Sequence, residues 1–299
     1  MHRKIVIFKT GLGLGDVLLS TSIIKAWHRI NRYDLLIVQT RFPELFKGNP
    51  DIRFSFHEDR RKSLESLFGK ALIWRLGSYF NRMLENNEVK IIYPFPCANR
   101  HLMDGMADEL GIELLDSERK PFVYLTEYEK NESGWARDHV VVQSTSTSYW
   151  TLNKGWIEGR MNELTARIRA RGLNVIQLGD AKDEKLDDVI DMRGKTGLRE
   201  SAAILSNAKL LIGLEGGLAH LARAVNCPAI IIYTGYTKPV ETGYSENINI
   251  RSDKAGESCW KREYCDHCRI SAGDISVENV FSEFEKWEQA DKGKASERK

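Results

Sequence analysis

The chain has 299 residues, of which 42% are hydrophobic and 29% are charged, as is typical of a globular protein with one large or two medium domains. The formal net charge of +2 argues against nucleic acid as a partner, because nucleic-acid-binding domains are usually more basic. Apolar runs are far shorter than the roughly 20 residues of a membrane-spanning helix, and the N-terminal apolar stretch is too short for a signal peptide. We therefore expect a cytoplasmic protein whose membrane contact, if any, is peripheral at the inner membrane.

The first 40 residues predict a β-α-β unit. Lys4–Phe8 is short, apolar and β-branched, as expected for a buried parallel strand. A glycine-rich loop follows at Thr10–Gly15, and Asp16–Arg32 then carries apolar residues at helical spacing. Leu35–Val38 is the next expected strand. Strands that alternate with helices in this way indicate a parallel sheet.

The region that follows is less regular. Leu64–Glu85 and Met103–Gly111 are expected to be helical, and Lys90–Tyr93 is a further strand candidate. Thr126–Asp138 is polar and charged, so we place a domain boundary there.

A second strand–helix series begins beyond this boundary. Its expected strands are Val140–Gln143, Val175–Leu178, Leu210–Ile212 and Ala229–Tyr233. Its expected helices are Trp156–Arg171, Glu200–Ser206 and Leu218–Val225, with a last amphipathic helix at Val277–Gln289. We predict an α/β protein with two Rossmann-like domains, residues 1–130 and 131–290, whose parallel sheets face a cleft, followed by a disordered tail at 291–299.

The N-terminal glycine-rich loop ends in an aspartate at the start of a helix. Its G-x-G-x-G spacing differs from the G-x-G-x-x-G of dinucleotide-binding folds, and no acidic residue follows the second strand. Because the carboxylate of Asp16 would repel a pyrophosphate, the loop is better suited to presenting a base to a neutral hydroxyl. The alternative is that Asp16 only caps the helix, which is worth about 1 kcal/mol.

A second glycine turn, Glu215–His220, also lies between a strand and a helix. Adjacent glycines there expose backbone N–H groups at a helix N-terminus, which attracts anions, and His220 is placed to bond a phosphate or ribose oxygen. Lys154 follows the first strand of the second series, where it can neutralise a diphosphate. The alternatives are a tight turn with a buried histidine and an ordinary solvated lysine.

Together these segments resemble glycosyltransferase family 9, the ADP-heptose:lipopolysaccharide heptosyltransferases. The residues that carry the resemblance are Gly15-Asp16-Val17-Leu18, Gly48-Asn49-Pro50-Asp51, Lys154-Gly155-Trp156, Arg193–Glu200 and Gly216–Ala222. They occur in the family's order and cover most of the chain. Family members commonly have aspartate where this chain has Glu215, and the segment between Arg53 and Arg100 matches no family motif.

The resemblance implies a GT-B fold and an inverting transfer of a sugar, heptose above all, from a nucleotide-diphosphate donor. In the family the aspartate that matches Asp16 is the general base, and no metal is required for catalysis. The first domain then carries the acceptor and the second an ADP-heptose-like donor, while the acceptor is a glycan or lipid-linked hydroxyl of lipopolysaccharide type. The expected donor-binding residues are Ser148, Lys154, Thr196, Glu215, Gly216, Gly217, Leu218 and His220, and Gly13 and Gly15 belong to the acceptor-side loop.

Three of the five cysteines, Cys259, Cys265 and Cys268, have the spacing of a metal site. In a reducing compartment, cysteines are free or metal-bound more often than paired in disulfides. A structural zinc or iron ion needs a fourth ligand, for which Cys97 and His267 are the candidates. The alternative is free thiols on a loop.

Two other functions stay open at this point. The glycine loop and Arg41 are compatible with an NADP-dependent oxidoreductase. A non-catalytic module that binds sugar nucleotides or glycans would share the fold and the anion site.

Overall fold

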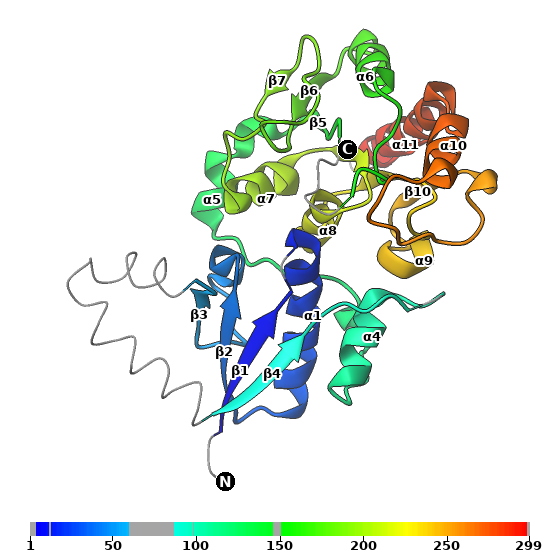
Figure 1. The fold of residues 1–299 in the computed structure, drawn as a ribbon. Helices are drawn as coiled ribbons and strands as arrows, with labels where there is room; N and C mark the ends of the chain where they lie inside the picture. The colour runs from blue at the N-terminus through cyan, green and yellow to red at the C-terminus, as the bar shows by residue number, and fades with distance from the viewer. Residues whose placement is uncertain (1–3, 12, 60–86, 98, 146–150, 298–299) are drawn as a thin grey trace. The chain divides into compact units, whose positions relative to one another are not determined.

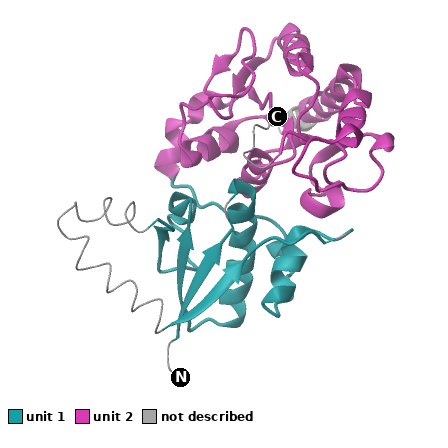
Figure 2. Cartoon of the chain, viewed as in Figure 1, with its two compact units in different colours: residues 1–126 teal, residues 127–299 magenta. Residues whose placement is uncertain are grey.

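The computed structural model describes residues 4–11, 13–59, 87–97, 99–145 and 151–297. The chain divides into two compact units, residues 1–126 and 127–299 (Figure 2). The predicted helix at Leu64–Glu85 and the donor-site candidate Ser148 lie outside the described residues. Within the described part, no helix is long and apolar enough to cross a membrane.

The first unit is built on a parallel sheet in the order β3-β2-β1-β4 (Figure 1). The strands are β1 (Ile5–Thr10), β2 (Leu35–Thr40), β3 (Phe54–His57) and β4 (Glu88–Ile92). Ile7, Ile37 and Phe56, one from each of the first three strands, form an apolar cluster. Three of these strands match predicted ones to within a few residues, while β3 was not predicted.

The described residues of the first unit also form two helices and two short 3-10 turns: α1 (Leu14–Ile30), α4 (Leu102–Glu109), η1 (Pro43–Phe46) and η2 (Asp116–Glu118). Helix α1 follows β1 directly and buries its apolar face, which includes Val17, Leu18 and Ile23. The hydroxyl of Thr21 in α1 accepts a hydrogen bond of 2.8 Å from the backbone N–H of Phe122. This bond attaches the last segment of the unit to the helix that begins at the glycine loop.

The second unit contains a parallel sheet in the order β10-β9-β8-β5-β6-β7. Its strands are β5 (His139–Val142), β6 (Asn174–Gln177), β7 (Ile190–Asp191), β8 (Leu210–Leu214), β9 (Ala229–Tyr233) and β10 (Ile248–Arg251). All residues of β8 and β9 are buried, as expected for parallel strands covered on both faces. The long apolar strands match their predictions, whereas the short β7 and the half-buried β10 were not predicted.

The other elements of this unit are α5 (Glu127–Glu132), η3 (Gly134–Ala136), α6 (Arg160–Ala170), α7 (Leu198–Asn207), α8 (Gly217–Ala224), α9 (Pro239–Thr242), η4 (Asp253–Ala255), α10 (Asp266–Asp274) and α11 (Val277–Glu297). Val280 and Phe284 of α11 belong to the same buried core cluster as Met161 and Leu164 of α6.

Two helices differ from the sequence-based expectation. Helix α6 was expected from Trp156 but begins at Arg160, because Gly159 before it has a φ of 79°. Helix α11 continues past Gln289 to Glu297 and so enters the segment expected to be a disordered tail. Lys292 forms an (i, i+4) ion pair of 2.9 Å with Glu288, a pairing that favours helix there.

Candidate functional site

The order of the second sheet fixes where a ligand is expected to bind. Strand β5 has β6 and then β7 on one side, and β8 followed by β9 and β10 on the other. The chain therefore reverses its direction of progress across the sheet between β5 and β8. In open α/β sheets, ligands bind outside the carboxyl ends of the strands at such a switch point. The segment with Lys154 follows β5, and Glu215 directly follows β8.

Lys154 and Glu215 form an ion pair at this position, with 2.7 Å between Nζ and Oε2. The Glu215 side chain is 5% exposed and that of Lys154 is 17% exposed. The Lys154 ammonium also lies 5.0 Å from the ring centroid of Tyr236. The interpretation of Lys154 as a solvated surface lysine is therefore wrong. An ammonium has three N–H donors, so one group can contact both the carboxylate and a phosphate oxygen.

Gly216 occupies a conformation that other residues do not adopt. Its φ of 150° and ψ of −161° fall in a region accessible essentially only to glycine. It is the N-cap of α8, and its carbonyl accepts the N–H of His220 at 3.2 Å. Gly217 and Leu218 form the first turn of the helix, whose N–H groups point towards the carboxyl edge of the sheet and favour an anion.

His220 is buried and bonded within the fold. Its Nδ1 lies 2.7 Å from Oη of Tyr244, and the two rings are nearly perpendicular. Burial raises the pKa of Tyr244 well above its ordinary value, so Tyr244 stays a neutral phenol. Arg223 lies over the Tyr244 ring and pairs with Glu246. These contacts agree with the interpretation of His220 as a buried structural histidine, and its contact with a donor stays a prediction.

Thr196 lies just before α7, at the same edge of the sheet. Its hydroxyl is 2.8 Å from that of Ser201 in the first turn of α7. This places Thr196 at a helix N-terminus, and its contact with a donor stays a prediction.

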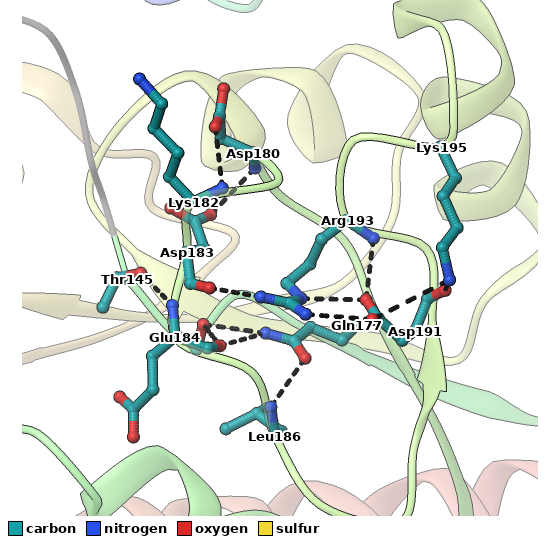
Figure 3. Close-up of polar contacts among 11 residues, drawn as sticks. Thr145, Gln177, Asp180, Lys182, Asp183, Glu184, Leu186, Asp191, Arg193 and Lys195 are labelled. Carbon is teal, nitrogen blue, oxygen red and sulfur yellow. Dashed lines mark hydrogen bonds and ion pairs between the residues drawn. The ribbon is translucent and has the colours of Figure 1, made fainter.

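An ion pair between Arg193 and Asp191, neither of which was predicted as a site residue, lies just before Thr196 (Figure 3). Arg193 donates from Nε and Nη2 to the two carboxylate oxygens of Asp191, at 2.9 and 3.0 Å. Its third nitrogen, Nη1, donates to the carbonyl of Asp183. The hydrogen bonds from Arg193 lower the pKa of Asp191 to about 2. The pair joins the end of β7 to the loop that follows β6.

The buried amide of Gln177, the last residue of β6, ties neighbouring loops together (Figure 3). Its Nε2 donates to the Ser144 hydroxyl at 2.9 Å and to the Glu184 carbonyl at 2.6 Å. Its Oε1 accepts the N–H of Leu186 at 3.0 Å. Gln177 therefore connects Ser144, just after β5, to the loop that follows β6.

In the first unit, Asp16 lies in the first turn of α1. Its Oδ2 accepts the backbone N–H of Gly13 at 3.1 Å, so the carboxylate does cap the helix. A Cβ atom at Gly11 would lie 2.6 Å from the Asp16 Cβ, and one at Gly13 would lie 3.0 Å from Oδ2. The glycines therefore make room for the aspartate itself. Asp16 is half-buried, as is Gly15, and the catalytic role of Asp16 stays a prediction.

The three cysteines of the predicted metal site come together with a histidine. The ligand atoms of Cys259, Cys265, His267 and Cys268 all lie within 4.8 Å of one another. A tetrahedral zinc site with metal–ligand distances of about 2.0–2.3 Å separates its ligands by roughly 3.5–3.8 Å, so these residues fit such an ion. His267, one of the two candidates for the fourth ligand, lies with the three cysteines in this cluster. Cys265 is the N-cap of α10, which places the two following ligands in the first turn of that helix.

The hydrogen bond of His267 suits a metal ligand, whereas the pKa values of the Cys265 and Cys268 thiols shift in opposite directions. Nε2 of His267 pairs with the Ala255 carbonyl, which orients the ring so that Nδ1 carries the lone pair. Burial opposes ionisation of Cys265, but hydrogen bonds from Cys268 and Cys259 outweigh it and lower the pKa of the Cys265 thiol. Burial and the neighbouring Cys259 raise the pKa of Cys268 above its ordinary value. Thiolates with an imidazole form a set that binds zinc or iron.

Comparison with known proteins identifies the family. The family model for glycosyltransferase family 9 (heptosyltransferase) matches residues 104–269, more than half of the chain. The chain belongs to glycosyltransferase family 9. Lipopolysaccharide heptosyltransferase 3 of Escherichia coli is 27% identical over 117 residues, which are 35% of this chain and 34% of that protein. The chain thus matches about a third of the length of this curated relative.

Solved structures of this family share the whole fold. An E. coli ADP-heptose lps heptosyltransferase II aligns with a TM-score of 0.69 and 16% identity, over 97% of this chain and 99% of that one. TibC of enterotoxigenic E. coli H10407 is described as an iron-containing dodecameric glycosyltransferase. It aligns with a TM-score of 0.70 and 14% identity, over 96% of this chain and 77% of that one. The predicted α/β fold of GT-B type, with two parallel sheets, is confirmed.

Proposed function

We propose that this protein transfers a sugar, heptose in the first instance, from an ADP-sugar to a hydroxyl of a glycan or lipid-linked acceptor. The observation that carries the proposal is the buried Lys154–Glu215 ion pair beside the glycine-only turn at Gly216, at the switch point of the sheet. Family membership and the heptosyltransferase relatives support it. A lipid-linked acceptor would bring the enzyme to a membrane surface.

The donor diphosphate is proposed to lie against the N-terminus of α8. There the backbone N–H groups at Gly217 and Leu218 and the ammonium of Lys154 stabilise the negative charge that develops on the leaving ADP. A carboxylate repels phosphate, so Glu215 serves to hold Lys154 in place and can accept hydrogen bonds from sugar hydroxyls. Ser148, Thr196 and His220 are proposed as further donor contacts.

Asp16 is proposed as the base. The acceptor oxygen forms its bond to the anomeric carbon from the face opposite ADP while the bond from that carbon to the diphosphate breaks, and the acceptor proton moves to the Asp16 carboxylate. A positioned base contributes about 10²–10⁴-fold in rate. Gly13 leaves room for this carboxylate, and Gly15 precedes Asp16 in the first turn of α1.

A panel of nucleotide sugars tests this function. ADP-heptose is expected to raise the unfolding temperature and to give a glycosylated product by mass spectrometry with a heptose-deficient lipopolysaccharide acceptor. NADPH is expected to do neither. Stabilisation by NADPH alone would favour an oxidoreductase, and donor binding without transfer or donor hydrolysis would favour a non-catalytic module.

We also propose that Cys259, Cys265, His267 and Cys268 hold one structural zinc or iron ion. The closeness of the four ligand atoms supports this, and TibC, a structural relative, is described as iron-containing. Elemental analysis of the purified chain is expected to find one equivalent of metal, which Cys265→Ser removes and Cys97→Ser leaves in place. Wild-type protein purified without any metal contradicts the assignment.

A further inference from the structure

The segment that carries the metal ligands also supports the proposed donor site. We name residues 259–268 the cysteine loop. Residues 259–265 form neither helix nor strand, and residues 266–268 begin α10. The cysteine loop contacts the segment Thr151–Lys154, whose last residue pairs with Glu215.

The side chain of Asn153 provides the first connection. It is 3% exposed, and its Nδ2 donates to the carbonyls of Lys261 at 2.8 Å and Glu263 at 2.6 Å. The Thr151 hydroxyl donates to the same Lys261 carbonyl at 3.3 Å. Both acceptor carbonyls lie between Cys259 and Cys265, so two proposed metal ligands flank them in the sequence.

The ring of Tyr236 provides the second connection. It lies beneath the Lys154 ammonium and 5.5 Å from the ring of Trp260, centroid to centroid. The backbone N–H of Trp260 donates to the Tyr236 carbonyl at 3.3 Å. Tyr236 also shares an apolar cluster with Cys265 and Cys268. Asn153, which precedes Lys154, and Tyr236, whose ring lies beneath the Lys154 ammonium, therefore both contact the cysteine loop.

The apolar cluster of the cysteine loop is small. It contains three buried residues, two of which are proposed metal ligands. A metal bound by four side chains of one short segment supplies the cross-link, and its binding energy then becomes energy for ordering the loop. If the loop loses its shape, Asn153 loses both carbonyl acceptors at a buried position, and such a loss favours rearrangement of residues 151–154.

We propose that a metal ion held by Cys259, Cys265, His267 and Cys268 positions Lys154 through Asn153 and Tyr236, so that metal loading sets the affinity of the site for the diphosphate of ADP. The inference rests on the proposed donor function of Lys154. It makes the metal a positioning device for donor binding, and Asn153 a positioning residue that contacts neither the ion nor the sugar.

Hydrogen–deuterium exchange and ADP titration of the full chain test the coupling together. Metal removed with a strong chelator is expected to increase exchange at residues 151–156 and to weaken ADP binding about tenfold, the loss expected for one misplaced charged contact. Adding Zn²⁺ is expected to reverse both changes. Circular dichroism checks that the stripped protein stays folded. Cys97→Ser, outside the metal cluster, is the matched control and should behave as wild type.

Asn153→Ala separates the positioning of Lys154 from metal binding, because it removes the contact to the cysteine loop without removing a metal ligand. The variant also tests the proposal if the metal-free protein unfolds. The variant is expected to keep one equivalent of metal while exchange at 151–156 rises and ADP affinity falls. Unchanged exchange and affinity, in the stripped protein or in this variant, overturn the proposal. If the metal-loaded wild type does not bind ADP, the donor function fails, while the exchange data still decide whether the metal orders the segment.

Discussion

Nζ of Lys154 lies 2.7 Å from Oε2 of Glu215, and both side chains are largely withdrawn from water. The two residues follow different strands, and the order of the sheet brings them together at its switch point. A buried ion pair is costly to break from one side, because the remaining charge then has no counter-charge. Variants of the two residues can therefore distinguish an effect on the stability of the fold from an effect on ADP binding.

Lys154→Met is expected to weaken ADP binding by roughly 10–100-fold, since a charge-assisted contact to phosphate is worth about 1.5–3 kcal/mol. It should also lower stability, because Glu215 remains buried and charged. The double variant Lys154→Met/Glu215→Gln is expected to recover stability but not ADP affinity. Calorimetric titration and thermal unfolding measure the two effects, and Lys286→Met, on the exposed face of α11, is the control. If ADP affinity returned with stability, Lys154 would have no direct contact with the diphosphate.

Gly216→Ala is expected to destabilise the protein by about 1–3 kcal/mol, because alanine does not adopt the backbone conformation of this turn without strain. The strain falls at the N-terminus of α8, so ADP binding should weaken as well. Urea unfolding and ADP titration measure the change. Gly293→Ala, in helix α11 with no atom within 4 Å of the added Cβ, should be neutral or slightly stabilising. Equal stabilities for the Gly216 variant and wild type would contradict the proposed constraint.

The Asp191–Arg193 pair predicts a dependence of stability on pH. Hydrogen bonds from Arg193 depress the pKa of Asp191 from 3.8 to about 2. A depressed carboxyl pKa stabilises the folded state above the unfolded-state value, and this contribution is lost as pH falls from about 4 to 2. Asp191→Asn is therefore expected to be less stable than wild type at pH 6, on the order of 1 kcal/mol for a partly exposed pair. The difference should shrink at pH 3, and a constant difference would show that the charge of Asp191 is not responsible.

The parts of the fold that the sequence predicts well are those with a strong local pattern. Ala229–Tyr233 is five consecutive apolar residues between a proline and polar residues, and the strand has the same bounds in the structure. Strand β7, by contrast, has two residues, Ile190 and Asp191, and two residues show no periodicity. The start of α6 depends on the positive φ of Gly159, a backbone choice that hydrophobic spacing does not reveal.

The candidate site divides in the same way. The glycine turn at Gly216 and the cysteine spacing are local signals, and the structure contains the turn and brings the three cysteines together, while the anion and the metal stay predictions. The sequence left both Cys97 and His267 as candidates for the fourth ligand, because His267 is directly adjacent to Cys268. In the structure Cys265 is the N-cap of α10, so His267 and Cys268 both lie in the first turn of that helix. The Lys154–Glu215 pairing depends on the order of the strands, which no local pattern carries. The Asp191–Arg193 pair has a local signal, an aspartate two residues before an arginine that precedes a glycine with positive φ.

The central claim is that Asp16 removes the acceptor proton during transfer from an ADP-sugar. Asp16→Asn keeps the size of the side chain and removes its basicity, and Asp108→Asn, an exposed carboxylate on α4, is the matched control. The decisive measurement is kcat for transfer from ADP-heptose together with ADP affinity in the same preparations. We predict that kcat falls by about 10²–10⁴-fold for Asp16→Asn while ADP affinity stays within twofold of wild type and the control is unchanged. A kcat close to that of wild type would contradict it.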